Sequence, residues 1–104
     1  MGLLSMIFGK KDNSELKDAI ANKAFVVDVR SPGEFNGGSV KGAVNIPLDQ
    51  INNNIAKFKG KKQVVVFCRS GMRSGQAKSI LERNGIENVI NGGGINNMYS
   101  ALSS

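Results

Sequence analysis

A run of apolar residues that ends at the chain's only cysteine constrains the fold more than any other stretch. Residues 64–67 are Val-Val-Val-Phe, and an uninterrupted apolar run of this length is typical of a strand buried on both faces of a parallel sheet. After Cys68 comes a basic, glycine-containing loop over residues 69–74, and residues 76–81 have helical apolar spacing. We therefore predict that Cys68 lies between a buried strand and a helix N-terminus, a position that favours anionic groups.

The composition excludes several kinds of site. The chain has 104 residues, enough for one domain with its own core. It contains one cysteine and no histidine. An internal disulfide, a Cys-x-x-Cys couple, a Cys–His dyad, a Ser–His–Asp triad and a histidine-ligated metal are all impossible within such a chain. We expect no metal and no cofactor.

The net charge of +6 is compatible with either nucleic-acid binding or attraction of small anions. The basic residues are mostly dispersed, and no aromatic residues are interleaved with them, so we expect a small anion and no nucleic acid. The apolar segment 1–8 is far shorter than the roughly 20 residues of a membrane span. We expect an N-terminal arm over residues 1–12, frayed or forming an edge strand, a domain over residues 13–104, a monomer, no membrane span and a cytoplasmic location.

The remaining pattern alternates helices and strands. We expect a helix capped by Ser14, a strand over 25–29, a turn at Pro32 and Gly33, and a short extended segment over 43–47. A helix after Asp49, a strand over 88–90, a tight turn over 91–94 and a weak helix over 95–102 complete the chain. The order predicts an α/β fold, a three-layer α/β/α sandwich around a mainly parallel sheet of about five strands.

Cys68 can act as a nucleophile only as a thiolate, and no histidine is available to activate it. Three sources of positive potential remain: the N–H groups of the loop, the start of the following helix, and Arg69 with Arg73. Gly71 gives the loop the freedom to point several N–H groups inward. The alternative is an inert buried thiol. This alternative is less favoured, because two arginines beside a buried thiol would cost free energy without an anion to pair with them.

Four blocks of sequence together resemble the single-domain rhodaneses. These are residues 26–35, residues 38–47, the Cys68 loop, and Gly93 with Gly94. The resemblance implies a sulfurtransferase of the thiosulfate sulfurtransferase type, with a rhodanese-like domain over residues 13–104. Cys68 would be the catalytic residue, taking a sulfane sulfur from thiosulfate, a polysulfide or a persulfide and passing it to a thiol or cyanide. The thiol could belong to a small molecule, a thioredoxin-like protein or another protein.

The resemblance also implies roles for the neighbouring residues. Substrate binding would fall to the loop residues Arg69, Ser70, Gly71, Met72 and Arg73, and support of the loop to Asp28, Arg30, Glu34 and Ser74. We expect Arg30 to pair with a carboxylate and brace the loop, and Gly93 and Gly94 to serve backbone geometry only. The chain departs from the family at Ser39, where a histidine is common, and at Met98, where a tryptophan is common.

The length of the loop bears on the substrate. Cys68 and Arg73 are separated by four residues, whereas the related phosphatase and arsenate-reductase loops resemble Cys-x5-Arg and hold a larger oxyanion. The shorter loop favours sulfur over phosphate. Two alternatives stay open: a persulfide relay or binding and sensing module with little turnover of its own, and, less favoured, a cysteine phosphatase or arsenate reductase.

Overall fold

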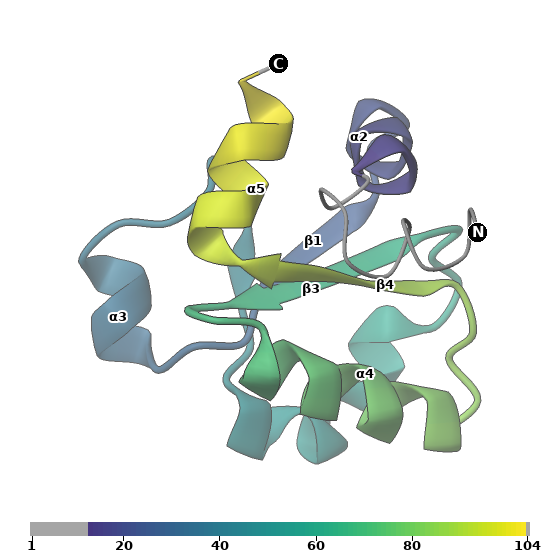
Figure 1. Cartoon of the computed structure of the whole chain (residues 1–104). Helices are drawn as coiled ribbons and strands as arrows, with labels where there is room; N and C mark the ends of the chain where they lie inside the picture. The colour runs from purple at the N-terminus through teal and green to yellow at the C-terminus, as the bar shows by residue number, and fades with distance from the viewer. Residues whose placement is uncertain (1–12, 104) are drawn as a thin grey trace, which may run out of the picture.

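A parallel sheet organises residues 13–103, the part of the chain that the computed structural model describes. Its strands are β1 (Phe25–Asp28), β2 (Val44–Asn45), β3 (Val64–Cys68) and β4 (Val89–Gly94), arranged in the order β2-β1-β3-β4 (Figure 1). The predicted parallel α/β fold is confirmed. We expected about five strands, and the described residues form four. The N-terminal arm expected over residues 1–12, with its possible edge strand, lies outside the described residues.

Helices cover both faces of the sheet. On one side lie α4 (Met72–Arg83) and the two short 3-10 helices η1 (Leu48–Gln50) and η2 (Asn52–Phe58). On the other side lie α2 (Ser14–Ala21) and α5 (Ile95–Leu102), while α3 (Pro32–Asn36) sits beside the sheet (Figure 1). The predicted three layers are therefore present. No helix in the described part of the chain is long and apolar enough to cross a membrane.

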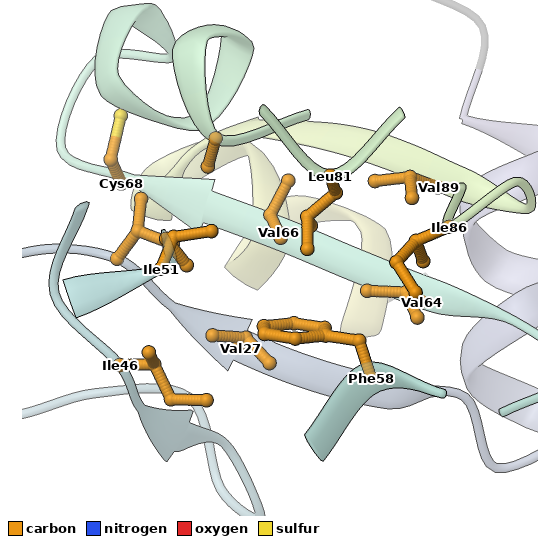
Figure 2. Packing of buried hydrophobic residues seen from close by; sticks show 12 residues of the cluster. Val27, Ile46, Ile51, Phe58, Val64, Val66, Cys68, Leu81, Ile86 and Val89 are labelled. Atoms are coloured by element: carbon orange, nitrogen blue, oxygen red, sulfur yellow. The ribbon is translucent and has the colours of Figure 1, made fainter. Parts of the chain in front are cut away.

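The all-apolar strand β3 lies in the middle of the core, as its sequence predicts. Every residue of β3 is buried, and alternate side chains point to opposite layers because the period of a strand is two. Val64, Val66 and Cys68 pack on the α4 side with Phe58 and Leu81 (Figure 2). The other face joins a second cluster that contains Met98, fully buried where the family often has tryptophan. Cys68 is thus held by the core.

One predicted helix is absent from the structure because of local backbone chemistry. The helix expected after Asp49 is replaced by η1 and η2, with non-helical dihedral angles at Asn54. Three consecutive asparagines favour turns over a regular helix, although Ile51 and Phe58 are still fully buried.

The other differences concern the ends of elements. The expected turn at Pro32 is the first turn of α3, where Ser31 and Glu34 form a capping box and the proline occupies the start of the helix. The tight turn expected over residues 91–94 is the second half of β4. The N-cap of α2 is Asn13, one residue before the expected Ser14.

Candidate active site

Cys68 is the last residue of β3, and the backbone turns sharply into α4 directly after it. Gly71, the residue before α4, has a φ of 100°, a left-handed conformation that glycine adopts without strain. The turn brings the first N–H groups of α4 over the end of β3. Cys68 therefore occupies the predicted position, between a buried strand and a helix N-terminus.

Hydrogen-bond donors surround the sulfur. The N–H of Gly71 donates to Sγ at 2.9 Å and the N–H of Ser74 at 3.4 Å, and the Ser74 hydroxyl lies 3.5 Å away. Burial by itself would raise the pKa of the thiol. The hydroxyl of Ser74 and the N–H groups of Ser74, Gly71 and Ser70 outweigh that effect and hold the pKa of Cys68 below its usual value.

The two arginines of the loop lie in different surroundings. The guanidinium of Arg73 donates to the carboxylate of Glu34 through both terminal nitrogens, at 2.7 and 3.1 Å. The hydrogen bonds from Arg73 lower the pKa of Glu34 to about 2. Arg73 still interacts electrostatically with Cys68, but the hydrogen bonds to sulfur described above come from N–H groups and Ser74. Arg69 is exposed.

The other expected support residues form a second network. Arg30 donates through Nε and Nη2 to the buried carboxylate of Asp28, with the Nη2 bond at 2.7 Å. The same Nη2 donates to the carbonyl of Gly38, and the Ser39 hydroxyl donates to Asp28, both at 2.7 Å. This network fixes the glycine-rich segment after α3. Within the expected support set, Glu34 and Ser74 are the two residues joined to the Cys68 loop.

Two residues that the sequence analysis did not place at the site contact the loop from β4. Asn91 accepts a hydrogen bond from the Ser74 hydroxyl at 2.7 Å. Gly94 lies so close to the loop that a Cβ built on it would sit 2.6 Å from the carbonyl oxygen of Arg69. The available signal was that Asn91 directly follows the strand predicted over residues 88–90, because a polar side chain at the end of a buried strand needs a hydrogen-bond partner.

The outer surface of the loop is polar apart from one side chain. Arg69 and Ser70 are exposed, and Met72 is 75% exposed. Cys68 itself has no exposed surface. A cavity of about 520 Å³ reaches Arg73 from the side of η1. A second cavity, of about 1000 Å³, lies at the other end of the strands, where β1 and β3 begin. None of the loop residues lines it.

The described residues contain no group of three or more His, Cys, Asp or Glu side chains that could hold a metal ion. The hydrogen bonds around Sγ offer the chemistry of one thiolate held by N–H donors. Such a cradle stabilises negative charge on the sulfur of Cys68 or on a second sulfur attached to it.

Comparison with known proteins shows which family and which proteins this chain is similar to. Residues 12–101 match a family model described as the rhodanese-like domain. Thiosulfate sulfurtransferase PspE of Escherichia coli is 42% identical over 71 residues, covering 66% of this chain and 68% of PspE. The uncharacterized protein YqhL of Bacillus subtilis is 41% identical over 69 residues, which span 66% of this chain and 55% of YqhL. A solved structure of a rhodanese with anions from E. coli has a TM-score of 0.64 at 40% identity, covering 69% of this chain and 87% of that one.

Proposed function

This chain belongs to the family of rhodanese-like domains, and on that premise we propose that it is a sulfurtransferase that carries sulfane sulfur on Cys68. The observation that carries the proposal is the set of N–H donors on Sγ, led by Gly71 at 2.9 Å. In a chain without histidine, these donors favour the thiolate over the thiol. The proposed donor is thiosulfate, as in the name of PspE, or another small anionic sulfane compound.

In the first half of the proposed reaction, the thiolate of Cys68 attacks the outer sulfur of thiosulfate. A sulfur–sulfur bond forms to Cys68, the sulfur–sulfur bond within thiosulfate breaks, and sulfite leaves with the electron pair. The product is a Cys68 persulfide whose terminal sulfur is anionic. The N–H groups of Gly71 and Ser74 support this step because they stabilise negative charge before and after the transfer.

In the second half, an acceptor thiolate or cyanide attacks the outer sulfur of the persulfide. A bond forms between the acceptor and the outer sulfur, and the sulfur–sulfur bond to Cys68 breaks. The electron pair of the broken bond stays on Sγ, which restores the Cys68 thiolate. Cys68 is fully buried, so the groups that cover the sulfur must move for either reactant to reach it. Arg69, Ser70 and Met72 are exposed on this loop, and we propose that they meet the donor and the acceptor.

Intact mass spectrometry tests the proposal. Incubation of the reduced protein with thiosulfate should add the mass of one sulfur atom, and a thiol reductant should remove it. The Cys68→Ser variant, the matched control, should gain nothing. Absence of any added sulfur with thiosulfate, a polysulfide and a low-molecular-weight persulfide would rule out the proposed activity.

A persulfide relay with little turnover is the second candidate, and the complete burial of the sulfur favours it. A buried persulfide is protected from small acceptors and would be released mainly to a partner protein that opens the loop. Steady-state formation of thiocyanate from thiosulfate and cyanide separates the two. Rapid multiple turnover supports the enzyme, whereas one sulfur loaded per chain with negligible turnover supports the relay. Either role requires a reduced thiol, and we propose a reducing compartment such as the cytoplasm.

A further inference from the structure

The hydroxyl of Ser74 lies among three acceptors that compete for its single proton. Its oxygen is 2.7 Å from Oδ1 of Asn91 and 3.5 Å from Sγ of Cys68, and it is also 3.0 Å from the carbonyl of Gly71. A serine hydroxyl donates one hydrogen bond at a time. Which acceptor it serves therefore decides what it does for the cysteine.

The orientation of the Asn91 amide is fixed by its other contacts. The N–H of Gly93 can only donate, and it lies 2.9 Å from Oδ1. The amide nitrogen Nδ2 faces the carbonyl of Gly71, which can only accept, at 3.4 Å. The atom facing Ser74 is therefore an oxygen without a proton, and the bond between Ser74 and Asn91 must use the hydroxyl proton of Ser74.

This assignment determines the contact between Ser74 and Cys68. While the hydroxyl donates to Asn91, only its lone pairs are available to the sulfur, so the S–H of the thiol donates to the oxygen of Ser74. A thiolate has no proton to donate, and the hydroxyl must turn from Asn91 to stabilise it. The charge-assisted bond to a thiolate is the stronger one, but forming it costs the 2.7 Å bond to Asn91.

We propose that Asn91 is a positioning residue that controls the reactivity of Cys68 through the Ser74 hydroxyl, holding its proton in the thiol state and yielding it to sulfur in the thiolate state. The inference rests on the proposed role of Cys68 as the reacting thiol. It accounts for the placement of Asn91, which contacts Ser74 in the first turn of α4 from a position just before a register shift in β4. Val66 pairs with Asn91, while the next residue of β3 pairs with Gly93.

The test is a titration of the thiolate by its ultraviolet absorbance, which does not require the sulfur to be accessible or to transfer sulfur. The chain has one cysteine, so the Cys68→Ser variant supplies the background, including that of the single tyrosine. Asn91→Leu removes the nearer competing acceptor at similar size without adding charge and leaves the Gly71 carbonyl in place. We expect its midpoint to fall by about half to one pH unit, roughly a threefold to tenfold larger thiolate fraction below the midpoint.

The Ser74→Ala background shows whether the effect passes through the hydroxyl. In that background, Asn91→Leu should leave the midpoint unchanged. A midpoint that rises or stays constant in Asn91→Leu alone, or one that falls equally with and without Ser74, would overturn the proposal. The charged groups on the elements next to Cys68 at this end of the sheet are the same in both backgrounds: Arg69, Arg73, Glu34, Asp28, Arg30 and Asp49.

Asn91→Asp keeps the proposal testable if Asn91→Leu does not fold. The carboxylate can accept the same two hydrogen bonds and is a stronger acceptor for the Ser74 proton. We expect the midpoint to rise by about one pH unit or more, and about half of that rise or less to survive in Ser74→Ala, where only the added charge acts. An unchanged midpoint, or the full rise without Ser74, would contradict the proposal. Loading with thiosulfate is measured separately, so a chain that titrates as expected but takes up no sulfur would refute the proposed function and leave the role of Asn91 standing.

Discussion

Gly94 is the point where the second half of β4 touches the Cys68 loop, and its substitution by alanine tests how tightly the loop is held. Gly94 has a φ of −80° and a ψ of 161°, which any residue adopts, so the effect of a methyl group is purely steric. The new Cβ would lie 2.6 Å from the carbonyl oxygen of Arg69 and 3.3 Å from Cα of Ser70. Ordinary contact begins at 3.4 Å, so the first contact is 0.8 Å too short and both partners are backbone.

The size of the effect follows from that shortfall. Overpacking of this kind costs about 1–3 kcal/mol of the free energy of unfolding, roughly 5–20 °C in the melting temperature of a domain of this size. The loop cannot move by most of an ångström and keep the N–H of Gly71 at 2.9 Å from the sulfur. We therefore expect Gly94→Ala to raise the midpoint of the Cys68 thiolate titration by about half a pH unit or more as well.

Gly92→Ala is the matched control on the same strand. Its Cβ would also meet an atom at 2.6 Å, but that atom is Sδ of Met98, the flexible end of a side chain, with Cγ1 of Val65 at 3.2 Å. We expect a smaller loss of stability, about 1 kcal/mol, and an unchanged midpoint for Cys68. Thermal unfolding and the absorbance titration measure both effects. A Gly94→Ala protein that melts and titrates like the wild type would refute the claim that Gly94 sets the position of the loop.

Three further predictions concern charged and titrating groups. The pKa of Glu34 is about 2 in the folded protein against an ordinary 4.5, so its pairing with Arg73 stabilises the fold above pH 4.5 and is lost as the pH falls toward 2. Because both side chains are about one-third exposed, the loss is about 1 kcal/mol, and melts between pH 6 and 3 should show it in the wild type and not in Glu34→Gln. Asp28→Asn leaves the Arg30 guanidinium buried without its carboxylate, so urea unfolding should show a loss of about 3–5 kcal/mol, and an unchanged midpoint would contradict the buried pairing. Since the pKa of Cys68 is lowered, the midpoint of its titration should lie below the roughly pH 8.5 of a free thiol, and a titration centred at 8.5 or above would show that the donors do not act.

The placement of Cys68 could be predicted because it depends on local sequence. The unbroken apolar run of β3 makes a strand that must be covered on both faces, and the glycine in the following loop permits a sharp turn into a helix. The absence of histidine likewise restricts the activators of the thiol, because it is a property of composition and holds for any fold. Family resemblance supplied the expected sulfur chemistry, which composition and spacing could not.

The secondary-structure prediction was wrong in two segments whose residues have competing preferences. Residues 91–94 contain three glycines and look like a turn, yet pairing with β3 extends them into a strand. The segment after Pro47 has the apolar spacing of a helix, but it contains three consecutive asparagines and forms 3-10 turns instead. These turns still bury Ile51 and Phe58. At residues 91–94 tertiary pairing outweighs a weak local propensity, whereas after Pro47 the preference of the asparagines for turns outweighs the helical apolar spacing.

The sequence by itself determined that a lone thiol ends a buried strand and faces a helix N-terminus, because strand burial, turn chemistry and helix periodicity are properties of neighbouring residues. Only the tertiary structure decided which groups reach that thiol. Glu34 pairs with Arg73, 39 residues away in the sequence, and Asn91 contacts Ser74, 17 residues away. Such contacts depend on how distant segments are registered against each other, and a displacement of a single residue along β4 would point Asn91 away from the site.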